Sequence, residues 1–354
     1  MEFGIFNLMN RRHRSQEPAA MIRQTVAEVQ AAELAGFAVA WFTEHHFTNY
    51  SITPSPLMMV GHVAPQTATI RLGTAVVLPA LYQPARLLGE VAFADNLSGG
   101  RLIVGLGSGY QAYELARFGV TLEEARAVAD EWTELLADGL GRDEFEYHGR
   151  HIELPHTRFT TLPVQRPRPE IWIAGNSRES QRRAARGGHP LFVTGFGQDS
   201  AALAKLRAEA EATFVGEGRD PATLRFATLR YCFVTDDRHE ALTFAENARF
   251  QLRLSRYLRQ GQTELAAAWL PEQASEGEMT PEDIAAGNPI GDPHRVAEKL
   301  VAEILGARPW HIALYMTIGA VDHRQALRSI ERFGAEVVPL IEREVGPIAL
   351  KAAE

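Results

Sequence analysis

The chain is poor in the residues that build disulfide bonds and lysine-dependent sites. Its 354 residues include one cysteine, Cys232, and three lysines, Lys205, Lys299 and Lys351. A single cysteine excludes an internal disulfide bond and a metal cluster held by several thiolates. Cys232 stands in an apolar run, so we expect a buried, unreactive thiol on a strand. The lysines all fall in expected helices or in the tail, and none is expected at a strand end.

Long apolar runs and basic clusters are absent as well. No apolar stretch approaches the ~20 residues of a membrane span, and the first residues lack the charged start and apolar run of a signal peptide. The formal net charge is −8, and acidic and basic residues are mixed along the chain. Proteins that bind nucleic acid usually carry a basic patch. We therefore expect a cytoplasmic protein that binds neither nucleic acid nor membranes.

What the sequence does contain is a regular alternation of short apolar runs with longer amphipathic segments. Strands are predicted at residues 3–8, 37–42, 71–78, 102–106, 171–174, 191–194, 224–234 and 310–316. Helices are predicted at residues 18–36, 57–63, 84–97, 123–140, 177–186, 201–213, 238–258 and 323–341. Such alternation indicates βαβ units around a parallel sheet.

The number of predicted strands indicates the fold class. About eight strands predict an α/β fold, a (β/α)₈ TIM barrel with insertions, formed as a single domain over residues 1–354. An open doubly wound sheet is the competing arrangement. Two insertions interrupt the alternation. Residues 144–154 suggest a hairpin, and residues 259–289, rich in Gly, Pro, Glu and Gln, are either a lid over the catalytic face or a solvated loop.

The first candidate site is Glu44-His45-His46-Phe47, immediately after the second predicted strand. In a TIM barrel, catalytic side chains gather at the carboxyl ends of the strands. Adjacent histidines on an extended segment point to opposite sides, so they form a poor metal-chelating pair. One imidazole that faces the barrel mouth could exchange protons near neutral pH. The alternative is that both histidines make structural hydrogen bonds.

Two further segments could bring backbone N–H groups close to a ligand. Residues 105–109 carry glycine at every second position, but Tyr110 stands where a dinucleotide-binding fingerprint needs its third glycine. Residues 173–180 run from a strand through Asn176 and Ser177 into a helix. The free N–H groups of a helix N-terminus can bind phosphate, although ordinary N-capping by Ser177 accounts for the same residues.

Taken together, these motifs resemble the bacterial-luciferase-like monooxygenase family, and the resemblance extends over nearly the whole chain. It is carried by Phe3-Gly4-Ile5-Phe6, Glu44-His45-His46-Phe47, Leu72-Gly73-Thr74-Ala75-Val76-Val77-Leu78-Pro79, Gln83-Pro84, Leu97-Ser98-Gly99-Gly100-Arg101-Leu102, Asn176-Ser177 and Asn288-Pro289-Ile290-Gly291-Asp292-Pro293. The Glu-His-His-Phe and Ser-Gly-Gly-Arg pieces, in that order, are specific to the family.

The resemblance implies a luciferase-like TIM barrel that binds FMN at its C-terminal mouth, with His45 as the functional histidine. The residues that would hold the 5′-phosphate are Asn176, Ser177 and Ser180, together with the backbone near Ser108 and Tyr110. The residues that would lie beneath the flavin ring, or line the ring or substrate pocket, are Phe6, Glu44, Ala75, Val76 and Thr194. At Ala75 and Val76 the family often has an unusual peptide bond.

The resemblance also implies the reaction. Reduced FMN from a separate flavin reductase would react with O₂ to give a flavin-4a-peroxide, which oxygenates a small organic substrate that we expect to be apolar. A lid that excludes water would prevent loss of the peroxide as hydrogen peroxide, and His45 would steer protonation. Residues near the mouth, Leu57, Met58, Met59 and Leu81, could line an apolar pocket or belong to the core. A homodimer is expected.

Two departures from the luciferases themselves concern the end of the fourth strand. Their reactive cysteine corresponds to Gly107, and the phosphate-binding arginine that follows it corresponds to Ser108. Phosphate binding would then depend on other groups, such as Arg178 or backbone amides. Light emission requires pairing with a specialised second subunit, which nothing in the sequence indicates.

Three other functions remain open. A deazaflavin-dependent oxidoreductase of the same superfamily would move hydride without O₂ and would need basic residues around the mouth for its acidic cofactor tail. A non-catalytic flavin-binding protein would be expected to have lost barrel segments and the histidine motif, and both are present here. A phosphate-binding barrel lyase or isomerase would need a lysine or paired carboxylates at strand ends, and the sequence has neither.

Overall fold

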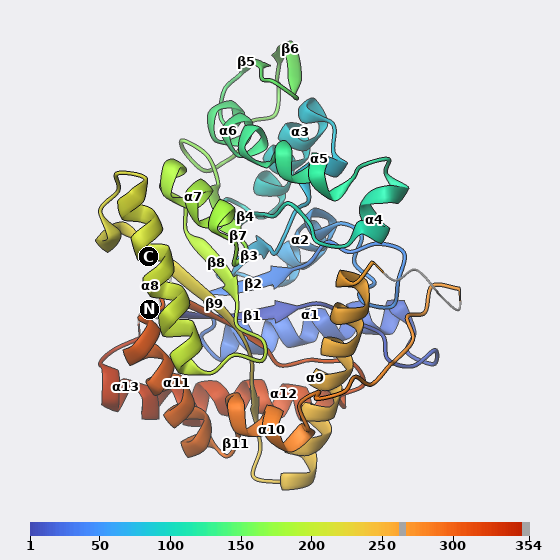
Figure 1. Ribbon diagram of the computed structural model, residues 1–354, viewed down its shortest axis with the longest axis vertical. Coiled ribbons are helices and arrows are strands. Elements are labelled where there is room, and N and C mark those ends of the chain that lie inside the picture. Colours follow the sequence, from blue (N-terminus) through green and yellow to red (C-terminus); the bar gives the residue numbers. More distant parts are fainter. Residues whose placement is uncertain (262–266, 349–354) are drawn as a thin grey trace.

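The computed structural model describes residues 1–261 and 267–348, and within these ranges eight parallel strands close into a barrel (Figure 1). The order around the barrel is β1-β12-β9-β8-β7-β4-β3-β2. The predicted TIM barrel is therefore confirmed, and the open sheet is excluded. The barrel strands are β1 (Glu2–Asn7), β2 (Val39–Phe42), β3 (Arg71–Thr74), β4 (Leu102–Leu106), β7 (Glu170–Ala174), β8 (Leu191–Thr194), β9 (Phe226–Tyr231) and β12 (His311–Tyr315).

Helices surround the barrel and connect its strands. They are α1 (Pro18–Leu34), α2 (Pro56–Val63), α3 (Pro84–Leu97), α4 (Ala112–Arg117), α5 (Leu122–Ala127), α6 (Ala129–Gly139), α7 (Arg178–Gly187), α8 (Ser200–Gly216), α9 (Arg238–Arg259), α10 (Pro281–Gly287), α11 (Pro293–Ala307), α12 (His323–Arg332) and α13 (Val338–Val345). Several begin with proline, whose fixed φ and missing N–H suit the first helical position. Others begin after an aspartate whose carboxylate accepts backbone N–H groups, as in α9, α11 and α12.

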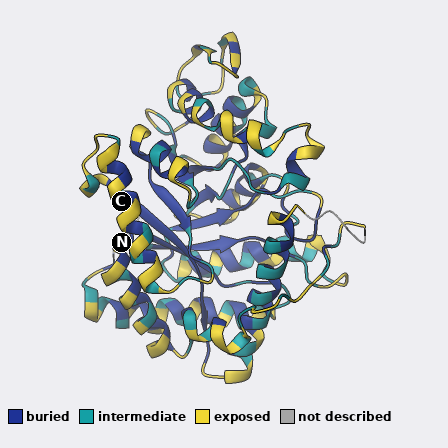
Figure 2. Ribbon diagram, in the orientation of Figure 1, coloured by how far each residue is buried: buried dark blue, intermediate teal, exposed yellow. Residues whose placement is uncertain are grey.

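The core has two layers, one inside the barrel and one between the strands and the helices (Figure 2). Large aromatic rings fill the barrel: Trp41 packs at 4.8 Å from Trp172 and 5.1 Å from Phe192, measured between ring centroids. Trp41 also donates a hydrogen bond from Nε1 to Nε2 of His311, at 2.9 Å. Because the interior is packed with side chains, a ligand can bind only at an end of the barrel or outside its wall.

Four predicted elements differ from those observed. Strand 71–78 ends at Thr74, before the cis peptide bond between Ala75 and Val76, and only an isolated parallel bridge from Val77 to Leu106 follows. Strand 224–234 is interrupted at Cys232, after which β10 (Phe233–Val234) pairs with β11 (Ile290–Gly291) outside the barrel. Helix 123–140 is two helices, α5 and α6, and helix 323–341 contains a π-helical turn at 333–337. Periodicity did not resolve these breaks because the apolar pattern continues across them.

Other local predictions are confirmed. The hairpin forms from β5 (Glu144–His148) and β6 (Glu153–Arg158), which pair antiparallel. The thiol of Cys232 is fully buried, and this burial raises its pKa, as expected for an unreactive cysteine. Leu57 and Met59 lie in the core, whereas Met58 is exposed to solvent, so these residues form no substrate pocket.

The segment 259–289 is largely ordered. Residues 262–266 of it lie outside the described residues. The rest packs against the barrel mouth: Leu270 is buried, and its N–H donates to Oδ1 of Asn49 at 2.8 Å, while the N–H of Asn49 donates to the carbonyl of Ala268. The segment then forms α10, which begins with a Thr280–Asp283 capping box. The described part is therefore a packed cover, which we name the mouth cover (residues 267–289).

Candidate active site

The carboxyl ends of the eight strands all lie at one end of the barrel, on the side occupied by α4 and α9 (Figure 1). His45 follows β2 at this end. Its Nδ1 lies 3.1 Å from Oε1 and 3.3 Å from Oε2 of Glu114, a buried residue of α4. The His45 ring also packs edge-on against Tyr50, at 4.8 Å between centroids. The imidazole is thus held on two sides, with a carboxylate directed at one ring nitrogen.

Glu44 and His46 form a second carboxylate–imidazole pair beside the first. Nε2 of His46 lies 3.1 Å from Oε1 of Glu44, and Oε2 of Glu44 accepts the backbone N–H of Leu78 at 2.9 Å and the hydroxyl of Tyr82 at 3.2 Å. Burial raises the pKa of Glu44, and these donors oppose that rise only in part. As expected, the two histidines point to different partners. No group of three or more potential metal ligands occurs in the described part of the chain.

The end of β4 is shaped by contact with the turn after β3. A Cβ atom on Gly107 would lie 2.8 Å from Cγ2 of Val76, so a side chain at position 107 would collide with Val76. The contact with Val76 therefore favours glycine at position 107. The cis peptide bond Ala75–Val76 is the unusual bond that the resemblance implies at this place.

The start of α7 carries several polar side chains and follows β7, the neighbour of β4 in the barrel. Asn176 uses its whole side-chain amide to join β7 to β8: Nδ2 donates to the carbonyl of Thr194, and Oδ1 accepts the N–H of Thr194, both at 2.9 Å. Ser177 caps α7 by accepting the N–H of Ser180 at 3.2 Å. The Ser180 hydroxyl occupies the space that a Cβ on Gly175 would need. Asn176 therefore acts as a structural bridge, and the two serines remain as hydroxyl donors.

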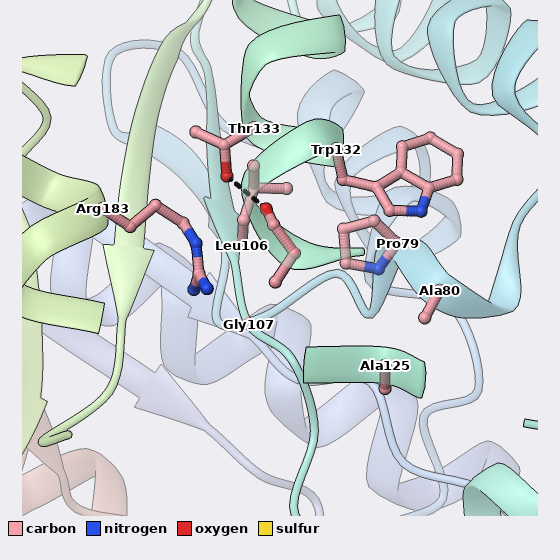
Figure 3. A pocket seen from close by; sticks show the side chains of 9 residues that line it. Pro79, Ala80, Leu106, Gly107, Ala125, Trp132, Thr133 and Arg183 are labelled. Atoms are coloured by element: carbon pink, nitrogen blue, oxygen red, sulfur yellow. Dashed lines mark hydrogen bonds between the residues drawn. The ribbon is translucent and has the colours of Figure 1, made fainter. Parts of the chain in front are cut away.

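A small hollow opens between the end of β4, α6 and α7, which we name the β4 hollow (Figure 3). The Arg183 side chain extends from α7 toward Leu106 and Gly107, with Trp132 on the opposite side. Arg183 is held through its Nε, 2.6 Å from Oδ1 of Asp130. The exposed Arg178, by contrast, does not line the hollow. The residues that line the hollow are Pro79, Ala80, Leu106, Gly107, Ala125, Ala129, Trp132, Thr133 and Arg183.

A larger pocket, of about 290 Å³, lies next to His45, and we name it the His45 pocket. It is enclosed by the loops after β1 and β2 and by the mouth cover. The residues that line it are Arg11, His45, His46, Phe47, Thr48, Asn49, Ser51, Ile52, Pro54, Ala268 and Trp269.

The sequence-predicted residues fall into two groups around these cavities. Glu44, His45 and Tyr110 lie on the side of the His45 pocket, where the rings of His45 and Tyr110 are 6.1 Å apart. The α7 residues and Ser108 lie at the ends of β7 and β4, which are neighbouring strands. Phe6 is deeper, in the barrel interior, edge-on to Tyr315.

Sequence reasoning missed Glu114, Gln111, Arg183 and Arg11. Glu114 lies 69 positions from His45, on a helix of six residues, too short to give a periodic signal. Nε2 of Gln111 lies 3.0 Å from Nδ1 of His45. Arg11 follows the first strand, a place in which strand-end reasoning could have singled it out. Arg183 lies on the same helix as Arg178, and only helix orientation distinguishes them.

The sequence was compared with known families and proteins. The sequence model of the luciferase-like monooxygenases matches residues 1–307. The chain belongs to this family. An uncharacterized protein of Sinorhizobium fredii, y4vJ, is 40% identical over 98% of this chain and 99% of its own length. The oxygenase component of a flavin-dependent trigonelline monooxygenase from Acinetobacter baylyi is 27% identical over 96% of this chain and 95% of its own length.

Solved structures support the luciferase-like barrel. The monooxygenase RslO1 from Streptomyces bottropensis has a TM-score of 0.83 at 22% identity, over 96% of this chain and 99% of that one. The oxygenating constituent of 3,6-diketocamphane monooxygenase from Pseudomonas putida, in complex with FMN, has a TM-score of 0.77 at 18% identity, with 96% and 98% covered. An F420-dependent secondary alcohol dehydrogenase has a TM-score of 0.73 at 17% identity, with 96% and 98% covered. At these identities the likeness establishes the fold alone.

Proposed function

We propose that this family member is an FMN-dependent monooxygenase that uses reduced FMN and O₂ to oxygenate a small organic substrate. The observation that carries the proposal is the pairing of His45 with the buried Glu114 at the mouth of a luciferase-like barrel. The flavin-dependent monooxygenase from Acinetobacter baylyi, similar over nearly its whole length, supports the flavin. Because that relative is named as an oxygenase component, we propose that a separate reductase supplies the reduced FMN here also.

The donors at the start of α7 suit the phosphate end of FMN. The first turn of a helix presents N–H groups without partners and the positive end of the helix dipole, both of which attract phosphate. Ser177 and Ser180 add hydroxyls, and Arg183 adds a guanidinium directed at the neighbouring β4 end. We assign to Arg183 the phosphate-binding role that the resemblance gives to an arginine at position 108, where this chain has Ser108. The β4 hollow measures about 10 Å³ in this conformation, so its side chains must move apart when a flavin binds.

The turn after β3 suits the flavin ring. Ala75 and Val76 form a small apolar surface, and the Val76 side chain lies directly against Gly107. A flat aromatic ring gains most from such an apolar surface. We therefore assign Ala75 and Val76 to the ring, and Asn176 and Thr194 to holding α7 in place. When bound there, reduced FMN supplies the electrons that activate molecular oxygen.

His45 is the residue that we assign to proton transfer. A neutral imidazole cannot donate to Glu114 and accept from Gln111 through the same Nδ1. The carboxylate is the stronger partner because a charge-assisted hydrogen bond is about twice as strong as a neutral one. Gln111 can turn its amide to present oxygen to the same N–H. Glu114 thus fixes the proton on Nδ1, which leaves Nε2 as the basic atom that can take or give a proton in the pocket.

The mouth cover is the part that we assign to excluding water. Ion pairs fasten it to α9, where Arg253 contacts Glu272 at 3.1 Å and Glu278 at 3.0 Å. A further pair joins it to the loop after β1, where Arg12 contacts Glu272 at 2.8 Å. An active site closed in this way protects reactive oxygen species from bulk water, which would otherwise release them as hydrogen peroxide.

Two measurements test this proposal. Anaerobic equilibrium titration with reduced FMN should show saturable binding that is tighter than that of riboflavin, which lacks the phosphate. Mixing the complex with O₂ should then release less hydrogen peroxide than free reduced FMN does. If coenzyme F420 binds in preference to FMN and O₂ is not consumed, the deazaflavin-dependent oxidoreductase is the correct function instead.

We further propose that residues 1–354 form one domain and that the enzyme is a cytoplasmic homodimer, as the family resemblance implies. None of the helices within the described ranges has the length and apolar character that crossing a bilayer requires. Sedimentation equilibrium should give the mass of two chains, and a monomer at micromolar concentration would contradict the dimer.

A further inference from the structure

The His45 pocket has an unusual charge balance. The described side chains that line it include Arg11, His45 and His46, and none of them is an aspartate or a glutamate. His45 and His46 each have a carboxylate partner behind the pocket wall, in Glu114 and Glu44. Arg11 has no such partner: among the described residues it forms no ion pair. Within the described ranges, the charge of Arg11 is therefore the one in the pocket wall that no carboxylate balances.

The hydrogen bonds of Arg11 leave part of its guanidinium available. Nη2 donates to the carbonyl of Arg14 at 2.9 Å, and Nε is shielded from solvent without an acceptor in the described part of the chain. Its guanidinium carbon lies 5.2 Å from the centre of the Trp269 ring. A shielded N–H that finds no acceptor costs free energy, and a ligand oxygen can recover it.

The neighbouring Arg12 shows the contrast. Its Nη2 lies 3.1 Å from Oε1 of Glu246 and 2.8 Å from Oε1 of Glu272. Arg12 therefore fastens the mouth cover, and its charge is balanced within the protein. Two adjacent arginines on one loop thus have different roles, and only Arg11 faces the pocket.

The other walls of the pocket are largely apolar. Phe47, Ile52, Pro54 and Trp269 provide apolar surface, and His45 stands on the same wall as the proposed proton-transfer atom. The volume of about 290 Å³ is at the lower limit of the range typical for ligand sites, which indicates a small molecule.

We infer that the substrate of this enzyme is a small organic carboxylic acid, whose carboxylate pairs with Arg11 and whose apolar body lies against Phe47, Ile52 and Trp269. Guanidinium and carboxylate match in shape, since two parallel N–H donors meet two oxygens. That the acid is a substrate, and not only a ligand, rests on the proposed monooxygenase function. The inference replaces the expectation of a wholly apolar substrate with an acid that has an apolar body.

The test is calorimetric titration of the full-length protein without flavin, with benzoate as the probe and neutral benzamide as its isosteric control. Benzoate should bind at least ~10-fold more tightly, because a hydrogen bond to a charged group contributes roughly 1.5–3 kcal/mol. Arg11→Gln should lower benzoate affinity by roughly 10- to 100-fold on the same scale. Arg158→Gln, which changes an exposed arginine of β6 outside the pocket lining, is the control and should leave the affinity for benzoate nearly unchanged.

Four results would overturn the inference: no binding of benzoate, equal binding of benzamide, unchanged affinity in Arg11→Gln, or an equal loss in Arg158→Gln. If Arg11→Gln does not fold, the comparison of benzoate with benzamide on the unaltered protein still tests whether the pocket prefers a carboxylate. Because the titration contains no flavin, a negative result would not contradict the FMN and O₂ measurements that test the proposed function. Failure of those measurements would likewise leave an acid-binding pocket in place.

Discussion

Oε1 of Glu114 lies 3.1 Å from Nδ1 of His45 and also accepts the backbone N–H of His46, at 2.8 Å. One carboxylate oxygen thus holds both the ring and the backbone of the histidine motif. Because α4 carries Glu114 and also contacts α9, this oxygen ties the loop after β2 to the helices that cover the mouth. The residue that we propose for proton transfer is therefore connected through Glu114 to α4 and α9.

His45→Ala should leave FMN binding nearly intact and divert turnover to hydrogen peroxide, because the variant loses the imidazole without altering the start of α7. The measurement is the ratio of hydrogen peroxide released to O₂ consumed, in the presence of a substrate that the wild-type enzyme oxygenates. An unchanged ratio would remove His45 from the mechanism.

Glu114→Gln should act through His45 as a positioning effect. The amide can no longer fix the Nδ1–H tautomer as a carboxylate does, so the pH profile of coupling should shift while the affinity for FMN stays the same. Glu114→Asp, which keeps the charge, should restore part of the wild-type profile. An identical pH profile in Glu114→Gln would indicate that the residue only stabilises the loop.

Replacing Ser177 and Ser180 together with alanine should weaken FMN binding by about 2–3 kcal/mol, if each hydrogen bond to the charged phosphate contributes ~1.5 kcal/mol. Arg183→Gln should also weaken FMN binding, and Arg178→Gln is its exposed control. Riboflavin affinity, measured in parallel, should not change in any of them. The double variant also loses the α7 cap, so its unfolding by urea should be followed separately. Equal losses for FMN and riboflavin would assign these residues to helix stability alone.

Glu278→Gln should loosen the mouth cover. The hydrogen bond from Arg253 lowers the pKa of Glu278 to about 2. Since the folded pKa lies below the ordinary value of 4.5, this anchor is fully present above pH 4.5 and is lost as the pH falls toward 2. In the wild-type protein, hydrogen exchange of residues 267–280 should therefore accelerate as the pH falls through that range. In Glu278→Gln the same exchange should already be faster at neutral pH, and more hydrogen peroxide should be released. Glu282→Gln, an exposed change in α10, is the control, and equal exchange in both variants would contradict the anchor.

His189 should make stability fall in mild acid. Burial, with Arg168 and Arg225 nearby, lowers the pKa of His189 to about 4 from 6.5. The unfolded chain therefore takes up a proton first, and stability is lost as the pH falls from 6.5 to 4, by about 1.4 kcal/mol per unit at most. Urea unfolding across this range should be less pH-dependent in His189→Gln, whereas the exposed control His148→Gln should behave as wild type. An unchanged dependence would show that His189 is not its source.

Much of the fold could be predicted because its signals are local. Apolar runs of strand length, separated by amphipathic segments, give β4 and β8 with their bounds as observed, and proline at the first turn marks the start of α3. The chain breaks that were missed, at Val128 and Cys232, arise from packing, since neither residue disrupts the local pattern.

The candidate site divides in the same way. The sequence by itself determined that Glu44, His45, Ser108 and Ser177 lie at one end of the molecule, because the carboxyl ends of parallel barrel strands share one face. Only the tertiary structure decided which side chains meet there: Glu114 with His45, Asn176 with Thr194 as a bridge, and Arg183 directed at the β4 hollow. It also decided that Arg11 lines the His45 pocket with no counter-charge among the described residues. These pairings join residues far apart in the chain, and helix orientation, loop path and burial select them, none of which a local pattern contains.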